Sequence, residues 1–175
     1  LPIEETIEVR RRLEIEDDFI LFVGTIEPRK NLLTLLKAFE EILRSTSFRP
    51  QLVIAGKEGW LMQELFSYIK KSGVENRLRF TGYLTDEELR ALYSSCRVFV
   101  YPSLYEGFGL PPLEAMACGA PVIASRIPSI VEAVGHMAAR LVSSMDVQAL
   151  AHSIVEIMSD ENERQQLSLI GQQRA

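Results

Sequence analysis

Two carboxylates, Glu106 and Glu114, stand eight positions apart within the stretch YEGFGLPPLEAMACG, residues 105–119. Two glycines and a Pro-Pro pair separate them, and the interior of a core strand or helix would not tolerate that composition. Gly107 and Gly109 let the backbone approach a ligand closely, so that neighbouring N–H groups can bind an anion. Ionised carboxylates accept hydrogen bonds from paired hydroxyls, in which sugars are rich. The stretch therefore predicts a loop that binds a polyol, a phosphate and a second polyol in that order.

Glu114 also has a simpler interpretation. We expect a helix from about residue 112 to 118 that ends at Gly119. Glu114 would lie in its first turn, where the helix dipole favours a carboxylate without any ligand. Glu106 lies in the loop itself, where no such explanation applies. The residues alone leave both interpretations of Glu114 open.

Two adjacent cations, Arg29 and Lys30, stand in the stretch GTIEPRKNL. Asn31 is the expected N-cap of a helix that begins at Leu32. A cation before a helix N-terminus is unfavourable by about 0.3–1 kcal/mol unless an anion is also present. Two cations beside free helix N–H groups therefore favour a phosphate site, with a solvated pair as the alternative.

The common nucleotide motifs are absent from the sequence. The first apolar run is not followed by G-x-G-x-x-G, which disfavours a nicotinamide dehydrogenase. No G-x-x-x-x-G-K-[ST] occurs either, which disfavours a P-loop kinase. The predicted phosphate site therefore belongs to another class of nucleotide-binding protein.

The elements that must position these residues alternate along the chain. Short apolar runs predict strands at 19–23, 52–55, 78–80, 98–101, 121–124 and 139–142. Apolar residues at helical spacing predict helices near 32–43, 61–69, 85–93, 112–118 and 130, and from Asp146 onward. This alternation is typical of a doubly wound, Rossmann-like parallel sheet of about six strands with helices on both faces. Residues 1–15 are polar and are interpreted as a lead-in segment, which leaves 16–175 as the domain.

Three loops follow predicted strands directly, at 24–31, 56–60 and 102–112. In open parallel sheets, ligands bind outside the carboxyl ends of the strands. We therefore expect the three loops to line one shared crevice.

Composition and charge exclude several classes of function. The net charge of -5, without a long basic run, disfavours general binding to nucleic acid or anionic membranes. No apolar run approaches the roughly 18 residues of a membrane-spanning helix. Cys96 and Cys118 lack metal-ligand spacing and are expected to be reduced, which suits a cytosolic protein. No metal site is expected.

Five stretches together resemble the group 1 retaining glycosyltransferases, which have the two-domain GT-B fold. These are VGTIEPRKNL, LVIAGKEGW, RFTGYLTDEELRALYSSC, VYPSLYEGFGLPPLEAMACGAPVIAS and the closing helix. The stretch that contains Glu106 and Glu114 is similar to the E-x7-E signature of that family. The resemblance covers only the C-terminal, nucleotide-sugar-binding half, so it implies a partner N-terminal domain that recognises the acceptor.

The resemblance implies a role for each candidate residue. The catalytic group would be Glu106 on the donor sugar, with Arg29 and Lys30 holding the pyrophosphate and stabilising the leaving group. Glu114 would bind the ribose hydroxyls. Further contacts are implied from the amides at Phe108, Gly109 and Leu110, and from a base site near Gly82 and Tyr83 beside Gly56.

The resemblance also implies the partners. The donor would be a nucleotide diphosphate sugar, and the sugar would be transferred to a glycan or a lipid-linked acceptor. No metal or other cofactor would be needed. The EPRKN form resembles mannosyl- and rhamnosyltransferases of surface-polysaccharide assembly, which points to a GDP-linked donor such as GDP-mannose. The implied location is cytoplasmic, with peripheral association of the full-length protein at the inner face of the membrane left open.

Two features depart from the family pattern. Many relatives carry Gly-Arg after the first strand, where this chain has Gly24-Thr25, and Pro111 removes one amide from the glycine loop. Two alternatives to a retaining hexosyltransferase stay open at this point. One is a nucleotide-sugar-binding module without chemistry of its own, and the other is a sugar-nucleotide epimerase on a related fold.

Overall fold

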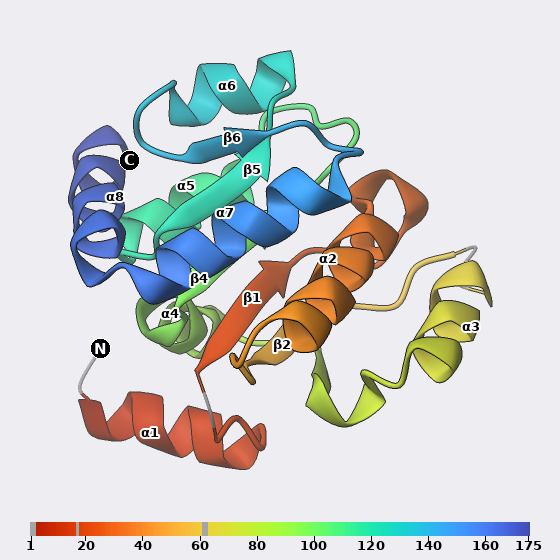
Figure 1. The fold of residues 1–175 in the computed structure, drawn as a ribbon. Helices are drawn as coiled ribbons and strands as arrows, with labels where there is room; N and C mark the ends of the chain where they lie inside the picture. The colour runs from red at the N-terminus through yellow and green to blue at the C-terminus, as the bar shows by residue number, and fades with distance from the viewer. Residues whose placement is uncertain (1–2, 17, 61–62) are drawn as a thin grey trace.

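A six-stranded parallel sheet with the order β3-β2-β1-β4-β5-β6 lies at the centre of the computed structural model (Figure 1). The structure describes residues 3–16, 18–60 and 63–175. The strands are β1 (Phe19–Val23), β2 (Gln51–Ala55), β3 (Leu78–Gly82), β4 (Val98–Tyr101), β5 (Val122–Ser125) and β6 (Arg140–Val142). This strand order is that of the Rossmann fold, so the predicted fold class is confirmed.

Helices cover both faces of this sheet. They are α1 (Ile3–Arg12), α2 (Leu32–Ser45), α3 (Gln63–Ser72), α4 (Asp86–Ser95), α5 (Leu110–Ala117), α6 (Pro128–Val134), α7 (Val147–Ser159) and α8 (Glu161–Arg174), with short 3-10 helices η1 (Pro28–Lys30) and η2 (Glu75–Arg77). Helix α2 packs against α7 and α3, whereas α4 packs against α1 and α5. Figure 1 shows α2 and α7 in front of the sheet and α4 and α5 behind it.

Burial of the strands follows from this layering. Every residue of β1, β2, β4 and β5 is buried, which explains why these strands are continuous apolar runs without alternation. Strand β3 lies at one edge of the sheet and alternates between more and less exposed residues. The core is therefore centred on β1 and β4, the two strands whose loops carry the candidate residues.

Several boundaries differ from those predicted. The lead-in segment forms α1, which packs against α4, and residues 1–2 lie outside the described residues. The helix predicted near 61–69 is α3, and residues 61 and 62 likewise lie outside the described part. The last predicted helix is divided into α7 and α8 by Asp160, whose side chain caps α8 by accepting from the amides of Asn162 and Glu163.

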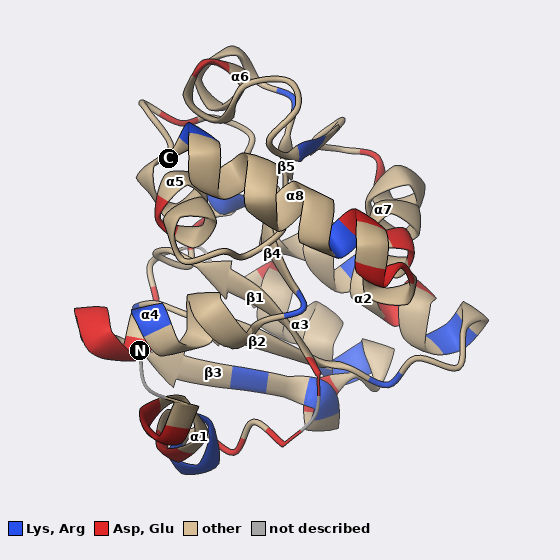
Figure 2. Cartoon of the chain, turned by 90° about the vertical axis from the view of Figure 1, so that its left-hand side faces the viewer, with Lys and Arg blue, Asp and Glu red and all other residues tan. Residues whose placement is uncertain are grey.

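Charge is distributed without a single-sign face on the side drawn in Figure 2, where Lys and Arg lie among Asp and Glu. Within the described residues, none of the helices is long and apolar enough to cross a bilayer.

Candidate functional site

Three loops meet at the carboxyl edge of the sheet, as predicted. Ile26 forms a bridge with Glu58 of the β2 loop and accepts a hydrogen bond at 2.9 Å from the amide of Gly59. On the other side, the carbonyl oxygen of Arg29 accepts a hydrogen bond at 2.8 Å from the amide of Leu104 in the β4 loop. The β1 loop is thus held between the other two. Strands β1 and β4 are also the topological switch point of the sheet, where ligands of such folds bind.

Close packing of the β1 and β2 loops explains why residue 56 is a glycine. At Gly56 φ is +145°, and an added Cβ would clash with the carbonyl oxygen of Gly24. No larger residue fits there without moving the β1 loop, because the obstructing atom belongs to the backbone.

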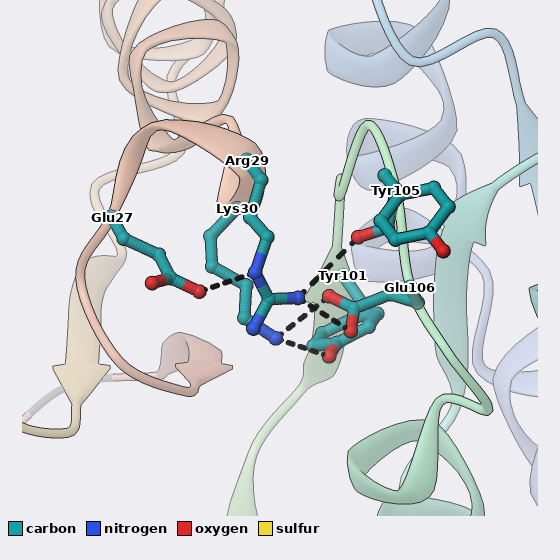
Figure 3. A network of polar contacts seen from close by, with 6 residues as sticks. All are labelled: Glu27, Arg29, Lys30, Tyr101, Tyr105 and Glu106. Atoms are coloured by element: carbon teal, nitrogen blue, oxygen red, sulfur yellow. Dashed lines mark hydrogen bonds and ion pairs between the residues drawn. The ribbon is translucent and has the colours of Figure 1, made fainter.

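Lys30 is brought beside Glu106 by the short helix η1. Pro28 opens this turn, and Asn31 ends it in the left-handed conformation with φ of 57°. Lys30 is 6% exposed, and its Nζ donates to Glu106 Oε1 and to the Tyr101 hydroxyl, both at 2.7 Å (Figure 3). A buried ammonium is destabilising unless it is paired and hydrogen-bonded, and these two contacts meet that requirement.

Arg29 lies between two carboxylates, as Figure 3 shows. Its Nη1 donates to Glu106 Oε2 at 2.9 Å, and its Nε lies 2.5 Å from Glu27 Oε1. Nη1 also lies 3.4 Å from the carbonyl oxygen of Tyr105. Both acidic partners are buried, whereas the arginine side chain is about half exposed. Arg29 is therefore a fixed guanidinium with one side open to a ligand.

Glu106 joins the two cations. It is 8% exposed, and each of its carboxylate oxygens meets a different cation. Burial by itself would raise the pKa of Glu106, but hydrogen bonds, that from Lys30 foremost, outweigh it and hold the pKa below its ordinary value. Glu106 is therefore ionised at neutral pH, and the four charges of Glu27, Arg29, Lys30 and Glu106 sum to zero.

Asn31 occupies the predicted N-cap position of α2, but the expected side-chain cap is wrong. Its Nδ2 donates instead to the carbonyl oxygens of Pro102 at 3.0 Å and Ser144 at 2.5 Å. Its Oδ1 accepts from the Thr34 hydroxyl at 2.8 Å. Asn31 thereby ties the β1 loop to the β4 loop and to the segment that precedes α7, which fixes the turn that presents both cations.

Glu114 lies in a different environment from Glu106. Helix α5 begins at Leu110 rather than near residue 112, so Glu114 is its fifth residue and its first turn holds no acidic residue. The dipole interpretation of Glu114 therefore loses its basis. The side chain is exposed, and its Oε2 accepts a hydrogen bond at 3.1 Å from the hydroxyl of Tyr93 in α4.

A pocket lies beside Glu114, between α4 and α5. Its volume is about 380 Å³. The lining residues are Asp86, Leu89, Arg90, Tyr93, Glu114, Ala117 and Cys118. The pocket offers two carboxylates, a guanidinium and apolar walls, a combination that suits the ribose of a nucleoside.

The remaining predicted residues lie in two places. Phe108, Gly109 and Leu110 form the start of α5, where Phe108 and Leu110 are exposed. Gly109 has φ of 87°, and an added Cβ would lie 2.6 Å from Ile130 Cδ1. Gly82 and Tyr83 are exposed at the end of β3, where Lys57 Nζ lies 5.0 Å from the centre of the Tyr83 ring. The structure thus brings Arg29, Lys30 and Glu106 into direct contact and places the other predicted residues at the same edge of the sheet.

Three side chains that contact the candidate residues were not predicted from the sequence. Glu27 precedes the cations by two and three positions, so its place in EPRK was a usable signal. Tyr101 ends an apolar strand, and Tyr93 lies in a helix, so both read as core residues in the sequence. Only their tertiary partners reveal that their hydroxyl groups face the site.

Comparisons with known proteins show which family the chain belongs to. A family profile described as "Glycosyl transferases group 1" matches residues 4–174. The O-antigen chain mannosyltransferase B of Escherichia coli is 41% identical over 147 residues, which are 84% of this chain and 38% of that protein.

Two solved structures share the fold. Sucrose-phosphate synthase from Thermosynechococcus elongatus is 30% identical with a TM-score of 0.83, covering 96% of this chain and 43% of that one. HepE of Anabaena, solved in complex with UDP and glucose, is 24% identical with a TM-score of 0.86, covering 99% of this chain and 49% of that one. The chain spans less than half of the length of each of these three proteins.

Proposed function

The chain belongs to the group 1 glycosyl transferases, and we propose that its crevice binds a nucleotide diphosphate sugar for retaining transfer of a hexose to a glycan or lipid-linked acceptor. One observation carries the proposal: Arg29, Lys30 and Glu106 converge at the switch point between β1 and β4. Two cations and a carboxylate at that place suit a diphosphate with a polyol next to it.

Arg29 and Lys30 receive the diphosphate in this proposal. Arg29 is open to solvent on one side, whereas Lys30 is buried behind it, so the two charges act on the diphosphate from different depths. As the bond to the sugar breaks, negative charge develops on the departing diphosphate, and fixed cations stabilise that charge without reorganisation. The amides at Phe108, Gly109 and Leu110 add donors at the start of α5.

The two carboxylates bind the two polyols. Glu106 meets the hexose next to the cations, and Glu114 meets the ribose beside the pocket between α4 and α5. The base then lies toward Gly82 and Tyr83, beside Gly56. This assignment gives each predicted site residue a role in binding the base, the ribose, the diphosphate or the sugar.

The donor is GDP-mannose or a similar compound in this proposal. The EPRKN stretch and the 41% identity to a protein named as a mannosyltransferase support mannose. No metal is needed, because Arg29 and Lys30 supply the positive charge that a metal ion supplies in other transferases. The acceptor binds in the part of the relatives that this chain does not cover.

Calorimetric binding tests the proposal directly. GDP, UDP, dTDP and ADP are each titrated into the chain with and without EDTA, and the corresponding nucleosides are titrated in parallel. We expect a nucleoside diphosphate, GDP first, to bind more tightly than its nucleoside, with no effect of EDTA. If none of the four diphosphates binds, or if EDTA abolishes binding, the proposal is wrong in its ligand or in its lack of a metal.

Glu114→Gln tests the ribose assignment within the same assay. The variant replaces the charged carboxylate that accepts hydrogen bonds from the two ribose hydroxyls. We therefore expect the binding free energy of the nucleoside diphosphate to weaken by about 1.5–3 kcal/mol. Glu106→Gln is the comparison variant, and it should lower the affinity for GDP-mannose more than the affinity for GDP, because Glu106 is assigned to the sugar. Unchanged affinity in Glu114→Gln would remove the ribose assignment.

A further inference from the structure

Two buried tyrosine hydroxyls each hold one end of the candidate site. Tyr101 is 1% exposed and Tyr93 is 2% exposed. The Tyr101 hydroxyl contacts Lys30 Nζ at 2.7 Å, and the Tyr93 hydroxyl contacts Glu114 Oε2 at 3.1 Å. Buried hydroxyls are destabilising without a partner, so each of these tyrosines depends on its charged neighbour.

Tyr101 occupies a position that phenylalanine would fill equally well as a packing residue. Its ring stacks on Phe22, with centroids 6.4 Å apart, and on Phe99, with centroids 6.0 Å apart. The other aromatic residues of β1 and β4, which are Phe19, Phe22 and Phe99, carry no hydroxyl. The hydroxyl of Tyr101 therefore serves its contact with Lys30 rather than the core.

Tyr93 has the same construction and also contacts Phe99. The Tyr93 ring meets Phe99 edge to face at 5.4 Å, and its hydroxyl reaches the pocket beside Glu114. Burial raises the pKa of both tyrosines above the ordinary value, so both hydroxyls stay neutral and keep their protons. One core phenylalanine thus supports two hydroxyls that point to opposite ends of the site.

We propose that Tyr101 and Tyr93 are positioning residues, Tyr101 for Lys30 at the diphosphate and Tyr93 for Glu114 at the ribose. This inference rests on the proposed function. Lys30 has a flexible four-carbon stem, and in the free protein it also pairs with Glu106. Once Glu106 meets a sugar, Tyr101 keeps the ammonium in place. Tyr93 likewise donates to one oxygen of the exposed Glu114 carboxylate and leaves Oε1 to accept from the two ribose hydroxyls.

The test compares Tyr101→Phe with Tyr93→Phe, each serving as the control of the other. Calorimetry with GDP, guanosine and 2′,3′-dideoxy-GDP gives two affinity ratios for each protein, and UDP, uridine and 2′,3′-dideoxy-UDP are measured in the same way. The phosphate ratio compares the diphosphate with its nucleoside, and the ribose ratio compares the diphosphate with its dideoxy form. Each ratio compares two affinities of the same variant. A partly unfolded fraction lowers both affinities by the same factor, so it does not change the ratio.

We expect each variant to lower a different one of the two ratios. Tyr101 acts on the ligand only through Lys30, so Tyr101→Phe should lower the phosphate ratio about 3- to 10-fold, less than the loss of a direct hydrogen bond to a charged group, and leave the ribose ratio unchanged. Tyr93→Phe should lower the ribose ratio by a similar factor and leave the phosphate ratio unchanged.

Other outcomes overturn the inference in distinguishable ways. If the wild-type chain binds and both variants keep both ratios, the hydroxyl groups do no more than stabilise the fold, and the proposed function survives. If both variants lower both ratios equally, the tyrosines do not act on separate ends. If the wild-type chain binds neither GDP nor UDP, the proposed function and this inference fail together.

Discussion

Lys30 and Glu106 form a buried pair whose two members depend on each other. Removing one partner of a buried ion pair is destabilising by about 3–5 kcal/mol, because the other charge is left uncompensated. Arg29 and Tyr101 lessen that penalty here, since each contacts one member of the pair. An anionic ligand can compensate Lys30 in the same way as Glu106 does. The side chains that hold the site together are thus the ones proposed to bind the donor.

Arg29→Ala and Lys30→Ala should each weaken diphosphate binding more than nucleoside binding. Both cations face the same proposed diphosphate, and the affinity of the wild-type chain for it should fall with added salt. Calorimetry of GDP and guanosine at low and high salt checks both statements. Arg44→Ala is the control, because it removes an equal charge from an exposed position in α2 that pairs only with Glu41 among the described salt bridges. Equal losses for GDP and guanosine would mean that the two cations only support the loop.

Glu106→Gln should make the free energy of unfolding less dependent on pH in the acid range. The pKa of Glu106 is lower in the folded protein than its ordinary value, so its contribution is fully present above the unfolded pKa, about 4.3. That contribution is lost as the pH falls through the lower, folded pKa. Urea unfolding at a series of pH values should therefore show a smaller loss of unfolding free energy on acidification in the variant than in the wild type. Parallel curves would contradict the ionised, paired state of Glu106.

At the scale of elements, the strands and most helices were predictable because their signals are local. The strand runs are apolar throughout, since a doubly covered sheet requires it, and that pattern is visible in any short window. The predicted start of α5, near residue 112, is wrong because Pro111 and Pro112 are also compatible with a first turn that begins earlier. Both fit just inside a helix that begins at Leu110, where backbone N–H groups have no partner within the helix.

The site was predictable to the extent that residue types carry chemistry. Glu106, Glu114, Arg29 and Lys30 are unusual in their loops, and the resemblance supplied their order. Their contacts were not predictable, because Lys30 and Glu106 are 76 positions apart and meet only through the pairing of β1 with β4. The same holds for Tyr93 and for the bridging amide of Asn31, whose partners lie in other elements.

Gly56→Ala should disturb the contact between the β1 and β2 loops. The new Cβ would meet the backbone carbonyl of Gly24, and φ of +145° is itself strained for alanine. Gly73→Ala is the control, because φ there is +72° and nothing lies within 4 Å of an added Cβ. We expect the control to cost about 1–2 kcal/mol through strain and Gly56→Ala about 1–3 kcal/mol more through overpacking. Thermal unfolding measures both, and equal losses would show that the loops do not pack as closely as the structure indicates.

At the scale of the whole molecule, the chain supplies a core of its own but spans only part of its relatives. The six-stranded sheet is covered on both faces, and its central strands are buried. The matched E. coli mannosyltransferase extends well beyond the shared 38%. In the proposed reaction, that further part positions the acceptor and excludes water from the crevice. Positioning of this kind contributes as much as about 7–11 kcal/mol to lowering a barrier.

The chain alone should therefore bind a donor and transfer nothing. Radiolabelled GDP-mannose is incubated with this chain and a panel of glycan acceptors, and free sugar, glycan product and isomerised donor are separated. Slow hydrolysis at most is expected, because open crevices leave the leaving group poorly stabilised. The full-length E. coli relative serves as the comparison for transfer. Transfer by this chain at a comparable rate would mean that residues 1–175 hold a complete active site, and isomerised donor would indicate an epimerase.

Nuclear magnetic resonance of the isotope-labelled chain during titration with GDP-mannose tests the central claim most directly, because it locates the ligand residue by residue. The predicted result is a set of amide shift changes at Arg29 and Lys30, along 107–110, at Glu114 and at residues 82–83, saturating together. Helix α1, whose residues Glu5 and Glu8 line a separate cavity, should stay unaffected and serves as the internal reference. No shift change at saturating donor, or changes gathered on α1, would contradict the account.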